Sequence, residues 1–422
     1  MRRWISGAVL AYVLYGLFIY LYIFQSGDSS VPDSVKGTPA DPATFMTGRE
    51  LILSEEYSKI RNFLFFIKIP FDWLVFFILL VAGFSKKIKS VLERATRFSY
   101  LRIAGYVFVL SVIVALCSLP LDWISYQIAL NYDISAQSTG SWIKDQVIDF
   151  WISFPLMTLV TIVFYALLKK SEKRWWLYAW LITVPFTLFL FFLQPVVIDP
   201  LYNDFYPLKD QELKADILAL ADEAKIPADQ VYEVNMSEKT NTLNAYVTGL
   251  GNNKRIVLWD TTLKELDKPE ILFIMAHEMG HYVMKHVYYG LGGYLLMSLL
   301  GLYFIDKIYR WLASRYRTML NIEGKHDLAA LPLLLAIVAI LSFLSSPLNN
   351  TVSRFMERQA DQYAIELTED KEAGIKTFQE LSIAGLSQTN PPALVKFFRY
   401  GHPTIMERIQ SLDNYKKGED RE

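Results

Sequence analysis

Residues 329–348 read AALPLLLAIVAILSFLSSPL, twenty consecutive residues without a charged side chain. A helix needs about 20 mostly apolar residues to cross the hydrocarbon core of a bilayer, so this stretch predicts a membrane-spanning helix. Five further stretches are free of charge and long enough to span: 4–25, 103–121, 150–168, 175–198 and 287–305. Together they indicate a polytopic membrane protein that is mainly α-helical.

A seventh stretch, residues 63–84, is equally apolar except for Lys68 and Asp72. These two residues are four positions apart and share one face of a helix. Charges at this depth usually face a partner or a wet interior rather than lipid. For Lys68 the alternative is a position near the interface, with its charge extended outward. The sequence therefore predicts seven transmembrane helices.

The composition of the whole chain agrees with a membrane protein. Of its 422 residues, 53% are hydrophobic and only 20% are charged, whereas about a quarter of a typical soluble protein is charged. The formal net charge is -1. Because nucleic-acid binding depends on a basic surface, we do not expect nucleic acid as a partner. The single cysteine excludes an intramolecular disulfide and a multi-thiolate metal site.

The short loops predict how the chain is oriented. Loops on the side of the N-terminus carry 17 Lys and Arg residues, and the short loops opposite carry 5. Lys and Arg accumulate on the cytoplasmic side of membranes, so the N-terminus is predicted to be cytoplasmic. Seven crossings then place the long segment 199–286 and the tail from residue 349 together on the extracytoplasmic side.

These two polar segments predict a small α+β domain that the last two spans divide. Segment 210–225 has apolar residues at helical spacing, and three short runs at 231–236, 244–249 and 255–259 are rich in strand-forming residues. The last two runs are separated by the turn-prone sequence LGNNK, and a helix is expected to start at 267–270.

The predicted organisation has four parts, and one connecting loop stands out. Residues 26–48 are rich in Ser, Pro, Asp and Thr and are expected to form an exposed loop. The four parts are the five N-terminal spans (1–198), the first part of the α+β domain (199–286), the last two spans (287–348) and the C-terminal part of the same domain (349–422).

The helix expected after residue 267 contains the sequence HEMGH at 277–281. Four residues advance a helix by about 400°, so His277 and His281 project from one face and can bind a single metal ion. Glu278 lies about 100° around from His277, close enough to activate a water molecule beside the metal without being a ligand. The alternative explanation is a polar helix face without a metal. The spacing favours one Zn²⁺ per chain.

A catalytic zinc has three protein ligands and an open fourth position, so a third ligand must come from elsewhere. The sequence SRFMERQADQYA at 353–364 follows the seventh span and carries Glu357 and Asp361 one helical turn apart. Glu357 is the candidate third ligand, and Asp361 the candidate acceptor for the second ring nitrogen of a ligand histidine. On local sequence alone, two solvated acids are the simpler explanation. His286 lies about 140° around a continuous helix from His281, so we expect it to point away.

Together these motifs resemble the membrane-embedded zinc metalloproteases of the type I CAAX prenyl endopeptidase family, relatives of the heat-shock membrane protease of bacteria. The resemblance implies helices that enclose an intramembrane chamber with the zinc at its rim. It also implies that Asn244 holds the substrate backbone, that His402 stabilises the tetrahedral intermediate, and that Arg408 supports the site. It rests on HEMGH, on SRFMERQAD at 353–361, on NAYVTGLGNNKRIVLWDTTL at 244–263, on DPLYNDFYPL at 199–208 and on GHPTIMERI at 401–409.

The expected function is that of a gluzincin-type zinc metalloendopeptidase, which hydrolyses internal peptide bonds of membrane-associated or misfolded proteins. Its expected partners are a peptide substrate and the lipid bilayer; the oligomeric state is open, and a monomer is compatible with the sequence. Eukaryotic members are expected to face the cytosol, whereas the loop charges here place the catalytic domain outside a bacterial plasma membrane, which would exclude prenylated cytosolic substrates. The alternative is a polytopic transporter or signalling scaffold with a structural or inactive metal site.

Overall fold

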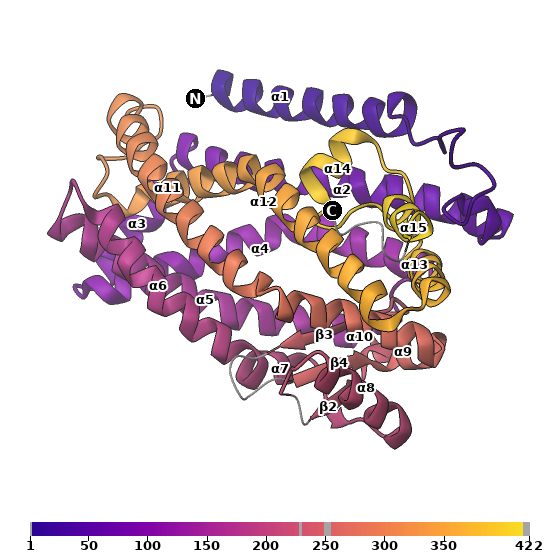
Figure 1. Ribbon diagram of the computed structural model, residues 1–422. Coiled ribbons are helices and arrows are strands. Elements are labelled where there is room, and N and C mark those ends of the chain that lie inside the picture. The colour runs from indigo at the N-terminus through magenta and orange to yellow at the C-terminus, as the bar shows by residue number, and fades with distance from the viewer. Residues whose placement is uncertain (1, 228–229, 249–254, 417–422) are drawn as a thin grey trace.

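The computed structural model describes residues 2–227, 230–248 and 255–416, and most of them are helical (Figure 1). The N-terminal half contains α1 (Arg2–Leu21), α2 (Gly48–Val81), α3 (Phe84–Ala95), α4 (Ser99–Asn131), α5 (Thr139–Lys170) and α6 (Trp175–Leu193). The middle contains α7 (Asp199–Tyr202), β1 (Phe205–Pro207), α8 (Gln211–Glu223), β2 (Val231–Val234), β3 (Ala245–Thr248), β4 (Arg255–Trp259), α9 (Asp260–Glu265) and α10 (Lys268–Val283). The C-terminal part contains α11 (His286–Arg315), α12 (Leu331–Thr368), α13 (Lys371–Ala384), α14 (Ala393–Arg399) and α15 (Ile405–Asp413).

Seven helical stretches in these ranges are long and apolar enough to cross a membrane, which confirms the predicted number of spans. Several continue well past the predicted limits, because turns outside the apolar part pack on the polar domain. The helix α2, for example, begins at Gly48 behind a capping box formed by Thr47 and Glu50. Farther along this helix, the hydroxyl of Ser58 donates to the carbonyl oxygen of Leu386 at 3.1 Å.

The two charged residues of the second span both have partners on α4. Lys68 forms an ion pair with Asp122, and the hydroxyl of Ser118 donates to Asp72 at 3.1 Å. Lys68 and Asp72 therefore share a helix face, as predicted, and the direct partner of each is on the neighbouring helix. These contacts agree with the expectation that charges at this depth face a partner.

The small sheet has the strand order β1-β2-β4-β3. β2 and β4 are parallel, whereas β1 and β3 are antiparallel to their neighbours. The three predicted strands and the predicted helix α8 are present, and the turn at LGNNK lies outside the described residues. The sequence reading missed β1, whose three residues end in proline. Within the described part of the chain, β3 pairs only with β4, so its other edge is free.

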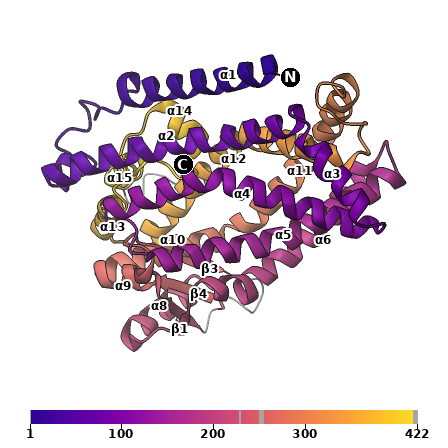
Figure 2. The same cartoon turned by 180° about the vertical axis from the view of Figure 1, so that it is seen from behind.

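The helix α10 and the C-terminal half of α12 lie side by side in both views (Figures 1 and 2). Gly280 permits this close approach, because a Cβ there would lie 3.1 Å from Cβ of Tyr363 and 3.3 Å from Cα of Ala360. α10 begins where the sequence predicted, and the Glu270 carboxylate accepts a hydrogen bond from the backbone N–H of Asp267 at 2.9 Å. The two polar segments are thus joined helix to helix.

A single helix of 38 residues, α12, runs from the membrane into the polar domain. Pro347 lies inside it and has no N–H to donate to the carbonyl oxygen of Phe343. The hydroxyl of Ser346 donates to this oxygen instead, at 2.7 Å. A side-chain donor of this kind satisfies the freed carbonyl and lets a membrane helix continue past a proline.

The segment 26–48 is only partly the exposed loop that its composition predicted. Val35 and Ala40 are 2% and 1% exposed and belong to a hydrophobic cluster with Phe378 of α13 and Met406 of α15. The prediction was wrong at these positions because two apolar side chains are enough to hold a polar segment against a neighbouring surface. The segment therefore packs on the C-terminal helices.

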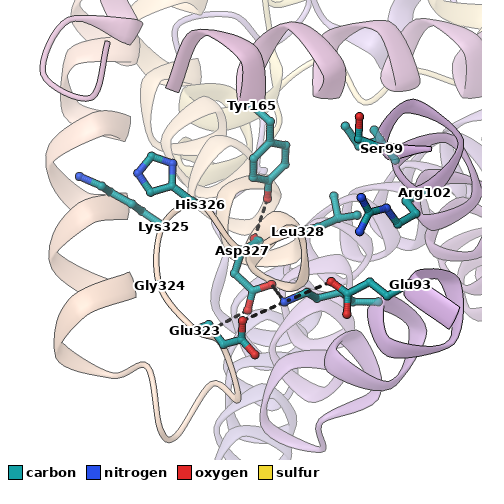
Figure 3. Close-up of a pocket in the computed structure, with 12 residues that line it drawn as sticks. Glu93, Ser99, Arg102, Tyr165, Glu323, Gly324, Lys325, His326, Asp327 and Leu328 are labelled. Atoms are coloured by element: carbon teal, nitrogen blue, oxygen red, sulfur yellow. Dashed lines mark hydrogen bonds and ion pairs between the residues drawn. The ribbon is translucent and has the colours of Figure 1, made fainter. Parts of the chain in front are cut away.

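At the end of the helix bundle away from the small sheet, an ion-pair network centred on Lys89 of α3 joins several segments (Figure 3). Lys89 of α3 pairs with Asp327 at 2.9 Å and with Glu323 at 3.0 Å. The carbonyl oxygen of Asp327 accepts from the hydroxyl of Tyr165 on α5 at 2.9 Å. A cavity of about 420 Å³ lies beside these residues. The network fastens the loop between α11 and α12 to α3 and α5.

Candidate metal centre and active site

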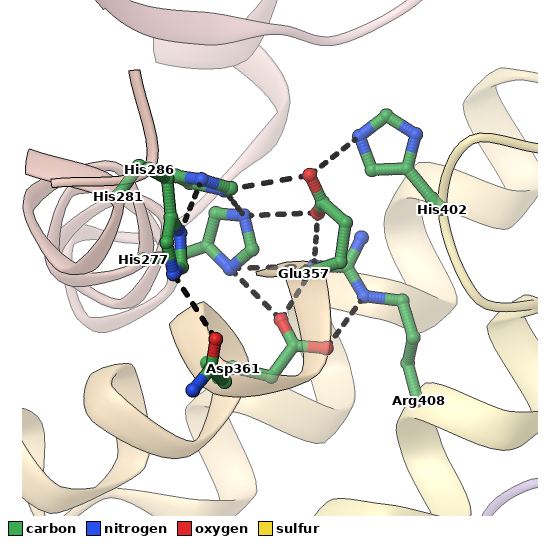
Figure 4. A network of polar contacts seen from close by, with 8 residues as sticks. His277, His281, His286, Glu357, Asp361, His402 and Arg408 are labelled. Carbon is green, nitrogen blue, oxygen red and sulfur yellow. Dashed lines mark hydrogen bonds and ion pairs between the residues drawn. The ribbon is translucent and has the colours of Figure 1, made fainter. Parts of the chain in front are cut away.

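Three side chains from α10 and α12 converge as the sequence predicted (Figure 4). Nε2 of His277 lies 3.2 Å from Nε2 of His281 and 3.3 Å from one oxygen of Glu357. Nε2 of His281 lies 3.4 Å from the other oxygen of Glu357. Around a tetrahedral zinc with bonds of about 2.0–2.1 Å, ligand atoms stand about 3.3–3.4 Å apart. The spacing of these atoms therefore fits one zinc ion.

A second observation on Glu357 supports the fit. Its Oε2 atom lies 3.3 Å from Nε2 of His277 and 3.8 Å from a nitrogen of Arg408, yet it is buried and accepts no hydrogen bond from the described residues. Buried polar atoms in proteins are nearly always hydrogen-bonded, and an exception in a functional cavity points to an ion or a ligand. A carboxylate oxygen next to two imidazole nitrogens is a suitable donor set for zinc.

Asp361 contacts His277 at Nδ1, the ring nitrogen that faces away from the proposed metal position. Its Oδ1 atom is 2.8 Å from Nδ1 of His277, and its Oδ2 atom accepts from Nε of Arg408 at 2.9 Å. A second nitrogen of Arg408 also contacts the carboxylate. Accepting from Nδ1–H of His277 leaves the lone pair of Nε2 directed at the metal position. Arg408 compensates the buried negative charge of Asp361.

Burial and neighbouring charges shift the pKa values of two groups on α10. Burial alone would lower the pKa of His277, but the carboxylates of Asp361 and Glu357 outweigh it and raise the pKa to about 9 in the metal-free protein. Burial raises the pKa of Glu278 above its usual range, although the two histidines act in the opposite direction. A raised pKa suits a carboxylate that must accept a proton and return it.

His286 does not point away from the site, so that prediction was wrong. α10 ends at Val283 and Lys285 has a left-handed backbone conformation with φ of 59°, so a continuous helix does not reach residue 286. Nδ1 of His286 lies 3.1 Å from Nδ1 of His281, and Nε2 of His286 lies 3.2 Å from the amide oxygen of Gln359. Because this oxygen accepts, Nε2 of His286 donates and Nδ1 of His286 accepts from His281. Nε2 of His281 then keeps its lone pair for a metal.

One cavity of about 430 Å³ beside the histidines contains the other predicted site residues, Glu278, Asn244 and His402. Nε2 of His402 lies 3.4 Å from an oxygen of Glu357, and its side chain is 65% exposed, so it stands at the rim. Asn244 directly precedes the edge strand β3. Its backbone N–H and carbonyl both hydrogen-bond to the hydroxyl of Thr262, each at 2.8 Å.

The same cavity contains residues that sequence reasoning did not single out. Arg61 comes from α2, Gln388 from the segment after α13, and Arg399 and Tyr400 from the end of α14. They lie far apart in the sequence, and no motif joins them. The one available signal was that Arg399 and Tyr400 immediately precede the GHP sequence at 401–403.

The family described as Peptidase family M48 matches residues 207–416, and the one described as CAAX prenyl protease N-terminal, five membrane helices, matches residues 29–204. A Bacillus subtilis protein named uncharacterized metalloprotease YhfN is 66% identical over 413 residues, which are 98% of this chain and 97% of that protein. The chain belongs to peptidase family M48.

Other M48 relatives are similar over less of their length. A CAAX prenyl protease 1 homolog of Dictyostelium discoideum is 33% identical over 283 residues, 64% of this chain and 63% of that protein. CAAX prenyl protease 1 of Saccharomyces cerevisiae is 29% identical over 327 residues, 72% of this chain and 70% of that protein. The resemblance seen in the motifs is thereby confirmed, and the chain is a membrane metalloprotease of this family, in which the metal is zinc.

The fold expectation is confirmed by a solved structure. The crystal structure of S. mikatae Ste24p has a TM-score of 0.81 and 23% sequence identity, and the match covers 97% of each chain. The M48 protein therefore has the fold of this membrane protease, mainly α-helical with seven transmembrane helices and a small sheet.

Proposed function

We propose that this M48 protein is a zinc-dependent endopeptidase that hydrolyses internal peptide bonds of membrane-associated or misfolded proteins. The observation that carries the proposal is the spacing of His277, His281 and Glu357, which suits one zinc ion, with Glu278 in the adjoining cavity. These three residues supply a single set of ligands and leave one position open, so we propose one zinc per chain.

The proposed mechanism divides the work among the residues around the metal position. When bound, zinc supplies Lewis acidity, which polarises the scissile carbonyl and makes a water molecule easier to deprotonate. Glu278 accepts the proton of the attacking water and returns it to the leaving amine. His402 donates to the oxygen that becomes negatively charged, and loss of one such donor typically costs about 10²–10³-fold in rate. Asp361 orients His277 through Nδ1, and Arg408 holds the carboxylate of Asp361 in place.

The free edge of β3 suggests how the substrate binds. An extended peptide can pair with an exposed strand edge and gain main-chain hydrogen bonds. Asn244 stands at the start of this strand, with its backbone held by Thr262, and lines the cavity that contains Glu278. We propose that its side chain holds the backbone of the peptide next to the scissile bond.

Replacing Glu278 by Gln tests the mechanism. We expect the purified variant to retain about one zinc per chain and to lose cleavage of a quenched fluorescent peptide, which chelation should also abolish in the unmodified protein. Glu366→Gln, an exposed position on α12, is the matched control and should cut normally. A Glu278→Gln variant that cuts as fast as the unmodified protein would exclude this mechanism.

The same measurements address the alternative function, a transporter or signalling scaffold with a structural or inactive metal site. A closed structural site would need a fourth protein ligand. His286 contacts Nδ1 of His281, the nitrogen that faces away from the proposed metal position. Nε2 of His402 lies 3.4 Å from an oxygen of Glu357, but His402 does not belong to the group of described residues whose ligand atoms all lie close together. Full zinc occupancy without cleavage of any peptide would favour the alternative.

We further propose that the protein lies in a bacterial plasma membrane with its metal centre outside the cytoplasm. The loop charges and the similarity to a Bacillus subtilis protein support this setting. A reporter enzyme fused to the C-terminus should be active only outside the cytoplasm, and activity confined to the cytoplasm would reverse the orientation. Peptides released from membranes with and without Glu278→Gln would distinguish defined substrates from general disposal of misfolded proteins.

A further inference from the structure

Three residues that line the cavity beside the metal centre carry a polar group without a partner. Nε of Arg61, Oε1 of Gln388 and the hydroxyl of Tyr400 are buried and have no hydrogen-bond partner in the described part of the chain. All three residues line the cavity that contains Glu278, and Gln388 is only 7% exposed. Because buried polar groups nearly always find a partner, unpaired groups around a cavity indicate that a ligand or water supplies one.

Two positive charges in this cavity lack a compensating acid. Arg399 donates to the side-chain oxygen of Asn62 and lies 5.3 Å from the ring centroid of Phe65. Arg61 lies 5.4 Å from the ring centroid of Tyr57. Across residues 2–227, 230–248 and 255–416, neither arginine forms an ion pair with a carboxylate. Burial and the charge of Arg61 lower the pKa of Arg399 to about 10, as expected for a cation without an anionic partner.

The third arginine that lines the cavity, Arg408, differs from Arg61 and Arg399 because it has an acidic partner. Arg408 makes two contacts with the carboxylate of Asp361, so its charge is compensated within the protein. The one acid among the described cavity-lining residues is Glu278, which the proposed mechanism uses as the base. A peptide that enters this cavity therefore meets two guanidinium groups whose charge no carboxylate of the described residues compensates.

We propose that Arg61 and Arg399 bind a carboxylate of the substrate, either its C-terminus or an acidic side chain. Guanidinium groups match the geometry of a carboxylate and form charge-assisted hydrogen bonds with it. The hydroxyl of Tyr400 can donate to the same group, and the amide oxygen of Gln388 can accept a backbone N–H of the peptide. The proposal rests on the proposed peptidase function, because the ligand is a peptide.

Peptide binding to the zinc-loaded Glu278→Gln variant tests the proposal without interference from cleavage. Three fluorescent peptides share one sequence: the first has a free C-terminal carboxylate and no acidic side chain, the second is its C-terminal amide, and the third is the amide with one glutamate introduced. We expect at least one acidic peptide to bind about tenfold to a hundredfold more tightly than the plain amide. Which of the two does so identifies the source of the carboxylate.

Substitution of Arg61 then tests whether this residue causes the preference for the acidic peptide. In the same background, Arg61→Gln should remove the preference for the acidic peptide and leave the affinity for the plain amide unchanged. Arg61→Lys should keep part of the preference, because the charge is retained but the planar guanidinium is lost. The control is Arg49→Gln, which changes an exposed arginine of the same helix and should preserve the preference in full.

Two results would overturn the carboxylate site. One is equal affinity for all three peptides in the Glu278→Gln background, a measurement that needs no change to the arginines. The other is an unchanged preference after Arg61→Gln. If the unmodified protein cuts all three peptides equally well, the peptidase function stands and the carboxylate site fails. If the preference is present but no peptide is ever cut, the binding site stands and the peptidase function fails.

Discussion

Replacing Asp361 by Asn separates two effects of one buried carboxylate. In the native protein its oxygens lie 2.8 Å from Nδ1 of His277 and 2.9 Å from Nε of Arg408, and its side chain is 4% exposed. Asn has nearly the same shape but no charge, so Arg408 remains buried without its anion. Removing one partner of a buried ion pair typically lowers the free energy of unfolding by about 3–5 kcal/mol. Loss of the acceptor that orients a ligand histidine typically weakens metal binding about 10–100-fold.

Because the amide oxygen of Asn can still accept one hydrogen bond, we expect the lower end of both ranges, about 3 kcal/mol and about tenfold. Competition with a chromophoric chelator measures the zinc dissociation constant, and titration with SDS in mixed micelles measures the free energy of unfolding. In the double variant Asp361→Asn, Arg408→Met the unpaired cation is gone. This variant should regain about 0.5–3 kcal/mol relative to Asp361→Asn, without any gain in zinc affinity. Unchanged zinc affinity in Asp361→Asn, or its recovery in the double variant, would refute the orienting role of the carboxylate.

Three further predictions concern the metal centre. His286→Ala should speed zinc release about tenfold, because the ligand histidine beside it loses the acceptor of its Nδ1–H; a chelator chase measures the rate, and an unchanged rate contradicts the contact. The pKa of His277, about 9 without metal, means that a proton must leave when zinc binds below that pH. The apparent zinc affinity should therefore rise about tenfold per pH unit from pH 7 to 9 and level off above, and a flat profile would contradict the shift. Gly280→Val should reduce zinc content per chain, because its Cβ would lie 3.3 Å from Cα of Ala360, whereas Gly290→Val, which meets open space, should not.

The membrane part of the fold could be predicted because apolar length is a local property of the sequence. All seven spans are present, but the helix ends were not predictable from hydropathy. The seventh span was expected to end near residue 348, whereas α12 continues to Thr368. Hydropathy falls where a helix leaves the bilayer, even when its backbone hydrogen bonds continue. The polar composition of segment 26–48 predicted an exposed loop, but Val35 and Ala40 within it pack against α13 and α15.

The metal centre was predictable where its residues share one helical turn and less so elsewhere. HEMGH places two histidines and a glutamate by helix geometry alone, whereas the candidate ligand on α12 required the parity of membrane crossings and a family resemblance. The prediction for His286 failed because of the left-handed residue Lys285, and lysine has no special preference for that conformation. Arg61 and Gln388 could not be found, because only the packing of α2 against the segment after α13 brings them together.

Pro347 in α12 bears on how this membrane helix can adapt to bilayer thickness. A transmembrane helix adapts to a thinner bilayer by tilting. If α12 were straight and rigid, the same tilt would move Glu357 at its other end. The part of α12 after Pro347 packs closely against α10 at Gly280, whereas the part before it packs in the core among the other spans. The backbone hydrogen bond missing at Pro347 gives the helix one place to bend. A bend at Pro347 would let the membrane part of α12 tilt in a thinner bilayer, while Glu357, about three turns farther along, keeps its distance from the imidazoles.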